Sequence, residues 1–188
     1  MRLAPTPRPP RLSPAGMILA LYSALALVAV GWGALRGNPN VFVLASVPRH
    51  TLAGIGAGCL FAVVVVFFSR FTVHRFEWAR TIDREFREIL GPMGGGERFL
   101  LAAASSVGEE FFFRGALLPY LGLWASSAVF ALPHIGPSWK FLPWTVTSFF
   151  VGVVFGKLFL LGGDLAGPIC AHFLINLINL RYITARRG

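Results

Sequence analysis

Long apolar runs alternate with short polar segments along this chain, and the pattern predicts an all-α, polytopic transmembrane helix bundle. A helix that crosses the hydrocarbon core of a bilayer needs about 20 mainly apolar residues. The fourth apolar run is the shortest, and it would cross only where tilted neighbours shorten the path. The predicted spans, about six in number, are 17–35, 51–68, 99–118, 121–133, 141–161 and 165–180.

The polar segments between these spans divide the chain into predicted regions. An N-terminal tail, 1–16, precedes a pair of transmembrane helices, 17–68, and an amphipathic connector, 69–98. A transmembrane core, 99–180, is followed by a C-terminal tail, 181–188. We interpret the short stretch 41–47 as interfacial.

The connector has apolar residues spaced among alternating charges, a pattern that fits two structures. It is typical of an amphipathic helix that lies in the headgroup plane. It also fits a solvated helix that carries Arg–Glu pairs along its surface. Both alternatives place an α-helix between the second and third spans.

Composition supports a membrane protein and excludes most soluble classes. Hydrophobic residues make up 55% of the chain and charged residues only 13%, whereas charged residues approach a quarter of an ordinary soluble domain. The formal charge is +9, but the basic residues flank the spans and do not form one aromatic-rich patch, so no nucleic-acid partner is expected. The expected partner is the lipid bilayer.

The positions of Lys and Arg predict the orientation of the chain. Most of them fall before the first span, in the connector and after the sixth span. Because short cytoplasmic loops carry the excess of basic residues, both termini and the connector are expected in the cytoplasm. The predicted location is the inner (plasma) membrane, as a multi-pass protein. The Arg-, Ala-, Gly- and Pro-rich composition of the chain fits a bacterial protein.

Several polar side chains lie inside the predicted spans. Each charged group at such a depth costs about 2.5–3.5 kcal/mol on insertion scales, so it marks a candidate functional site. The candidates are Glu109, Glu110 and Arg114 in the third span, His134 at the end of the fourth, and His172 and Asn176 in the sixth.

The first motif predicts different surroundings for its two glutamates. Glu110 and Arg114 are four residues apart, so they can form an ion pair along one helix face. Glu109 lies about 140° around the helix axis from Arg114. We therefore expect Glu109 to face a cavity and to meet His134.

The remaining candidates complete a set of groups that can hydrolyse a peptide bond. His172 and Asn176 share one helix face at four-residue spacing. One carboxylate, two imidazoles and an amide can together orient a water, accept its proton and stabilise an oxyanion. The same residue types also bind zinc, with Glu109, His134 and His172 as the alternative ligands. No compact HExxH motif is present, and we predict that no cofactor is required, with a divalent metal such as zinc as the alternative.

Three motifs in the second half of the chain resemble a known family. EEFFFR matches EExxxR, FALPH matches FxxxH and HFLIN matches HxxxN. In this order and inside apolar spans, 99–180 resembles the CAAX protease and bacteriocin-processing family of intramembrane peptidases, also called the Abi family. The resemblance implies an endopeptidase that cleaves a membrane-anchored protein or peptide, with 99–180 as its catalytic core.

The resemblance also implies roles for individual residues and a range of substrates. Glu109 would activate the attacking water with help from His134, while His172 and Asn176 would hold the oxyanion. Glu110 and Arg114 would support the first motif, and Phe130 would pack in the FxxxH motif. The expected reactions are bacteriocin or CAAX-like processing, or removal of C-terminal sorting signals in the manner of myxosortases. Prenylated substrates are less expected, because the chain has fewer spans than the eukaryotic members.

Two other classes of protein could place ionisable groups in a membrane. A proton-coupled transporter would use them to relay protons, and a non-catalytic immunity or scaffold protein would keep the fold without turnover. Neither explains why the three motifs occur together and in the family order. Solute flux without peptide cleavage would identify the transporter.

Overall fold

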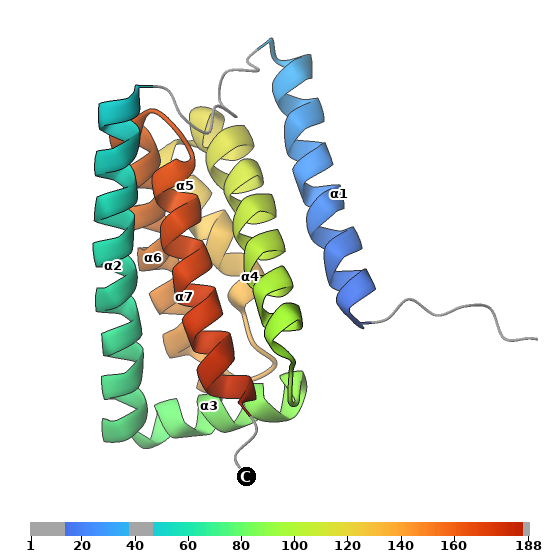
Figure 1. Ribbon diagram of the computed structural model, residues 1–188, viewed down its shortest axis with the longest axis vertical. Coiled ribbons are helices and arrows are strands. Elements are labelled where there is room, and N and C mark those ends of the chain that lie inside the picture. The colour runs from blue at the N-terminus through green and yellow to red at the C-terminus, as the bar shows by residue number, and fades with distance from the viewer. Residues whose placement is uncertain (1–13, 38–46, 186–188) are drawn as a thin grey trace, which may run out of the picture.

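The computed structural model describes residues 14–37 and 47–185, and these residues form helices and connecting turns (Figure 1). The predicted all-α class is therefore confirmed. Most of the predicted N-terminal tail, and residues 41–46 of the predicted interfacial stretch 41–47, lie outside the described residues. The elements in chain order are α1 (Pro14–Leu35), α2 (Pro48–Arg75), α3 (Glu77–Leu90), α4 (Gly95–Glu110), the π-helix η2 (Phe111–Leu117), α5 (Leu118–Ala131), the short 3₁₀ turns η3 (Leu132–His134) and η4 (Trp139–Phe141), α6 (Leu142–Gly162) and α7 (Ala166–Thr184).

The long helices stand side by side as one bundle, and α3 lies across one end of it (Figure 1). Helix α7 packs against α2 and α4, α5 packs against α6, and α1 packs against α4 and η2. The first residues of α1, the whole of α3 and the last residues of α7 lie at the same end of the bundle (Figure 1). This arrangement brings both described ends of the chain and the connector to one side.

Four helical segments of the described residues are long and apolar enough to cross a membrane. They are Gly16–Leu35, Pro48–Arg75, Gly95–His134 and Trp139–Gly162. The count is below the six predicted spans for two reasons. The third and fourth predicted spans fall in one helical segment, and α7 is made less apolar by His172, Asn176, Asn179 and Arg181.

The segment Gly95–His134 nevertheless reverses direction at Gly122. This residue has φ 73° and ψ 174°, a conformation that costs glycine little because it has no Cβ. The rings of Phe113 and Phe130 lie 5.1 Å apart, although 17 residues of unbroken α-helix would separate them by roughly 25 Å. The reversal therefore returns α5 alongside η2 and carries His134 back into the bundle.

Aromatic and small side chains fill the interior of the bundle. One buried cluster consists of Ala62, Phe113, Phe130, Phe155, Ala171 and Ile175. Large apolar side chains also cover the outside, and Leu27, Leu35, Phe67 and Leu161 are each more than 70% exposed. A hydrophobic exterior of this extent matches a protein whose solvent is lipid.

Helices α2 and α7 approach each other closely because glycines lie at their crossing. A Cβ atom on Gly58 would lie only 2.5 Å from the carbonyl oxygen of Gly167. Cys59 and Cys170 follow nearby, with their free thiols 3.6 Å apart. Before the start of α7, the turn from α6 is fixed by buried Asp164, which accepts hydrogen bonds from the Thr51 hydroxyl and from the Ala166 backbone N–H.

The connector forms helix α3, as both predicted alternatives require. Helix α2 continues to Arg75, and the extended backbone of Phe76 separates it from α3. The apolar face of α3 packs on the bundle, where Phe86 contacts the rings of Phe141 and Trp144. Its polar side carries the Arg87–Asp83 and Arg80–Glu77 ion pairs.

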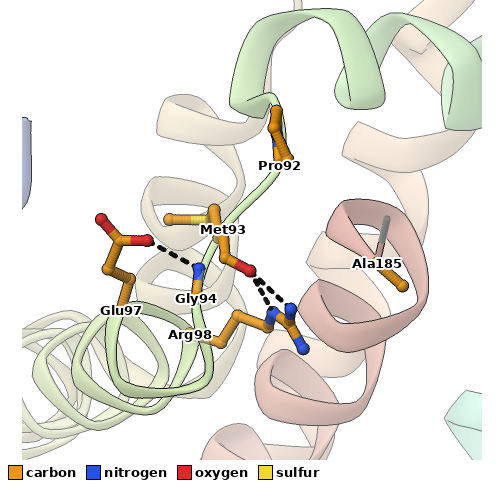
Figure 2. Close-up of a pocket in the computed structure, with 6 residues that line it drawn as sticks. All are labelled: Pro92, Met93, Gly94, Glu97, Arg98 and Ala185. Atoms are coloured by element: carbon orange, nitrogen blue, oxygen red, sulfur yellow. Dashed lines mark hydrogen bonds between the residues drawn. The ribbon is translucent and has the colours of Figure 1, made fainter. Parts of the chain in front are cut away.

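A surface pocket of about 620 Å³ opens beside the loop that enters α4. Figure 2 shows Glu97 accepting a hydrogen bond from the Gly94 N–H, and the Arg98 guanidinium donating to the Met93 carbonyl oxygen. These contacts fix the start of α4. The pocket is distant from the polar residues of the third predicted span, because Arg98 precedes Glu109 by roughly 16 Å of helix.

Candidate active site

The two glutamates of the first motif are the last residues of α4, directly before a π-helix. Segment Phe111–Leu117 has π-helical geometry. The π-helix is rare in proteins, and those that do occur are frequently found at functional sites. It contains Arg114 and packs against α1, α5 and α6. The first motif therefore spans a change of helix type that the sequence pattern did not predict.

Glu110 and Arg114 form a fully buried ion pair. The Arg114 Nη1 atom donates to Glu110 Oε1 over 2.9 Å, and its Nη2 atom donates to the Gly152 carbonyl oxygen of α6 over 2.9 Å. The two side chains expose 0% and 2% of their surface. The contact predicted from the four-residue spacing is present, and it also ties η2 to α6.

Glu110 has a second partner, His172 of α7. The His172 Nδ1 atom lies 2.8 Å from Glu110 Oε1. An ionised carboxylate can only accept hydrogen bonds, so Nδ1 carries the proton that His172 donates here. The His172 Nε2 atom is then the end of the ring that can exchange a proton. The Phe155 ring stacks on the imidazole at 5.1 Å between centroids and holds its plane.

Glu109 lies on the other side of His172. Its Oε2 atom is 4.0 Å from His172 Nε2 and is buried without a hydrogen-bond partner among the described residues. The separation exceeds a direct hydrogen bond, but one water molecule can bridge it. Tyr22 of α1 packs against Gly108 and interacts electrostatically with the same carboxylate. We expected Glu109 to meet His134, but the imidazole that lies 4.0 Å from its carboxylate is that of His172.

His134 is the last residue of η3, directly after α5, and contacts at its ring and its backbone hold it in place. Its Nδ1 atom lies 2.9 Å from the Phe130 carbonyl oxygen, which can only accept, so Nδ1 carries the proton. The Thr145 hydroxyl donates to the His134 carbonyl oxygen over 2.7 Å. The imidazole also contacts the Trp144 ring. As in His172, the Nε2 atom is left to exchange a proton.

Phe130 connects the groups of the site through its ring. Its centroid lies 4.9 Å from that of His134 and 6.0 Å from that of His172. The Arg114 guanidinium lies 4.3 Å from the same ring, within the range of a cation–π contact. The packing role predicted for Phe130 thus has contacts that match it.

Asn176 lies one helical turn after His172 and faces α4. Its Nδ2 atom donates to the Ser105 hydroxyl over 3.0 Å, and that hydroxyl donates onward to the Ala102 carbonyl oxygen. An amide group has two N–H donors, and Ser105 takes one of them. The predicted residues of all three motifs therefore gather around His172.

The alternative zinc ligands do not form a metal-binding cluster. Within residues 14–37 and 47–185, no group of three or more His, Cys, Asp or Glu side chains has the spacing that would hold a metal ion. His172 Nδ1 and His134 Nδ1 donate to protein oxygens and leave both Nε2 atoms free, an arrangement that metal-binding histidines share, so a divalent metal remains the alternative prediction.

Sequence reasoning missed four contributors to the site. Tyr22, Ser105, Trp144 and Phe155 contact the predicted residues. The position of Trp144 near a span end favours an interface anchor instead. Each of the four lies in an apolar or small-residue run whose pattern resembles ordinary span composition, so no local signal distinguishes it.

Comparison with known proteins found two similarities, both over less than half of the chain. Residues 97–178 match the family model described as type II CAAX prenyl endopeptidase Rce1-like. An uncharacterized protein of Bacillus subtilis (strain 168), YpbD, is 34% identical over 85 residues, which cover 42% of this chain. The match spans 43% of the length of that relative. No solved structure matches the chain.

Proposed function

We propose that the protein is an intramembrane endopeptidase that cleaves a membrane-anchored protein or peptide, because residues 97–178 match the family model of type II CAAX prenyl endopeptidases, Rce1-like. One observation carries this proposal. The buried Glu109 Oε2 atom has no hydrogen-bond partner among the described residues and lies 4.0 Å from His172 Nε2. A carboxylate buried in this way has the position of a general base.

In the proposed reaction, Glu109 accepts a proton from a water molecule bound beside it. The Nε2 atom of His134 can accept a hydrogen bond from the same water, because its Nδ1 proton is donated to the Phe130 carbonyl oxygen. The water oxygen forms a bond to the scissile carbonyl carbon, and the carbonyl π electrons move to the oxygen. The product of this step is a tetrahedral intermediate with one negative charge.

His172 and Asn176 are the proposed donors to that oxyanion. The protonated His172 imidazole offers Nε2–H while Nδ1–H remains bonded to Glu110, and Asn176 offers its second amide N–H. Donors held before the reaction begins stabilise developing charge at little reorganisation cost. Collapse of the intermediate breaks the C–N bond, and the proton held by Glu109 passes to the leaving amine.

Glu110 and Arg114 are proposed to support these steps without touching substrate. Glu110 accepts from Arg114 and His172 at a single oxygen atom, so it fixes the orientation of the imidazole. Arg114 balances the charge of Glu110 and anchors the pair to α6 through Gly152. We propose that no metal is required, since these residues supply both the base and the oxyanion donors.

The substrate is proposed to present its scissile bond next to a membrane anchor, as CAAX-like substrates, bacteriocin precursors and C-terminal sorting signals do. The site supports this because it lies within membrane-length helices. Comparing the termini of membrane proteins by mass spectrometry, in cells with and without the gene, would identify the substrate. A new terminus beside a transmembrane or lipid anchor is expected only when the gene is present.

Turnover itself is tested with purified protein in proteoliposomes that also contain the identified substrate. Cleavage by the natural sequence and its loss in Glu109→Gln would support the proposal. Solute flux without cleavage would instead support a proton-coupled transporter. Binding of the substrate without cleavage, unchanged by Glu109→Gln, would support a scaffold or immunity protein.

A further inference from the structure

We infer that Tyr22 of α1 is a positioning residue, whose hydroxyl hydrogen bond directs the Glu109 carboxylate toward the reacting water. Helix α1 lies outside the segment 97–178 that matches the family model. The inference rests on the proposed function, because it requires Glu109 to be the general base. It adds an element from the first helix to a site otherwise built from the second half of the chain.

The backbone of α1 is in direct contact with α4 at the residue before Glu109. A Cβ atom on Gly108 would lie 2.8 Å from the Tyr22 carbonyl oxygen and 3.1 Å from Tyr22 Cβ. Only a residue without a side chain allows this approach. The crossing places Tyr22 next to Glu109 in the chain's neighbouring helix, close enough for its phenol to interact with the carboxylate. The contact is therefore set by helix packing as well as by the side chain.

The other groups that face Glu109 do not fix its direction in the same way. His172 Nε2 is 4.0 Å from Glu109 Oε2, which is too long for a hydrogen bond. His134 and Arg114 act on Glu109 electrostatically, and Glu110 is committed to Arg114 and His172. We therefore assign the directional contact to the Tyr22 hydroxyl.

A direction for this carboxylate matters because glutamate has several rotatable bonds. Displacing a reacting group by about 1 Å can lower a rate by a factor of about 100. Loss of one orienting hydrogen bond, with the packing kept, is expected to cost less, about tenfold in kcat. Substrate binding is expected to be unchanged, because the Tyr22 hydroxyl points to Glu109 and the inference gives it no contact with substrate.

The test compares two tyrosine-to-phenylalanine variants, each at a contact between α1 and a neighbouring helix. Tyr22→Phe removes the hydroxyl that reaches Glu109. Tyr120→Phe is the matched control, because the Tyr120 ring also packs against α1 at Trp32, 6.0 Å between centroids. We expect Tyr22→Phe to lower kcat about tenfold with KM unchanged, and Tyr120→Phe to leave both unchanged. Equal kinetics in the two variants would overturn the inference.

A double-mutant cycle separates positioning of Glu109 from a general structural role. Glu109→Asp keeps a carboxylate but shortens the side chain, so the Tyr22 hydroxyl can no longer direct it as it directs Glu109. In that background, Tyr22→Phe is expected to cause little further loss, since coupled residues are not additive. A further tenfold loss would show that Tyr22 does not act through Glu109.

A backbone variant tests the same contact without changing the tyrosine. Gly108→Ala places a methyl group against the Tyr22 backbone and is expected to move α1 and lower kcat. Gly96→Ala, in the same helix, is the control, because a Cβ there meets nothing within 4 Å. In the Tyr22→Phe background Gly108→Ala should have a smaller effect. An undiminished effect would contradict the inference.

The inference and the proposed function fail in different ways. If the natural sequence shows no turnover, or Glu109→Gln leaves turnover intact, the proposed function is wrong and the inference falls with it. If Glu109→Gln abolishes turnover but Tyr22→Phe behaves like Tyr120→Phe, only the inference is wrong.

Discussion

His172 Nδ1 lies 2.8 Å from Glu110 Oε1, so a histidine of α7 and a glutamate 62 residues earlier form one hydrogen-bonded unit. The same oxygen accepts from Arg114. Glu110 therefore links the first and third motifs, while Glu109 occupies the opposite side of the imidazole. Adjacent residues with the same chemistry thus have different surroundings, and the site can be tested by separating them.

The first prediction concerns Glu109. Glu109→Gln keeps the size of the side chain but removes its capacity to accept a proton. Cleavage per folded molecule should fall by a factor of about 100 or more, within the range of general base catalysis. The variant should accumulate normally, because its Oε2 atom has no hydrogen-bond partner to lose among the described residues.

The second prediction concerns Glu110, which is fully buried. Glu110→Gln leaves Arg114 without its counter-charge, and removing one partner of a buried ion pair costs about 3–5 kcal/mol. The main effect should therefore be lower abundance and a lower melting temperature, measured on protein in detergent. If Glu110→Gln instead loses turnover at full abundance while Glu109→Gln retains it, the two roles are reversed.

The third prediction concerns metal dependence. A hydrolytic zinc ion should be removable, and its removal should abolish turnover. We expect the activity of the purified protein to survive EDTA and phenanthroline. Loss of activity in chelator with recovery on adding zinc would instead make Glu109, His134 and His172 ligands.

The fourth prediction concerns orientation in the membrane. The beginning of α1, the connector helix and the end of α7 share one end of the bundle (Figure 1), and the basic residues are concentrated in the same parts of the chain. Reporter fusions at Gly94 and Gly188 should therefore both report the cytoplasm. A periplasmic signal at either position would contradict this topology.

The fifth prediction concerns the crossing of α2 and α7. Gly58→Ala places a methyl group 2.5 Å from the Gly167 carbonyl oxygen, and overpacking of this kind costs about 1–3 kcal/mol. Gly56→Ala is the matched control two residues earlier, because a Cβ there meets nothing within 4 Å. The melting temperature should fall only for Gly58→Ala. Equal melting temperatures would show that the helices do not cross at this glycine.

The sequence alone determined the features that depend on nearby residues. Apolar runs of membrane length specify helices because a backbone in lipid must satisfy its hydrogen bonds internally. The Glu110–Arg114 contact follows from a four-residue spacing, and the common face of His172 and Asn176 follows from the same rule. The candidate site residues follow from their charge and polarity, because such groups are costly at membrane depth and are rare there without a function.

Tertiary structure decided which of these residues meet. The reversal at Gly122 depends on one left-handed glycine inside an apolar run, and it brings Phe130 and His134 back to the site. The partner of His172 was decided by the packing of α7 on α4, and the position of Tyr22 beside the first motif by the close approach of α1 to Gly108. Such contacts join residues far apart in the chain, and local periodicity carries no information about them, because it describes one helix at a time.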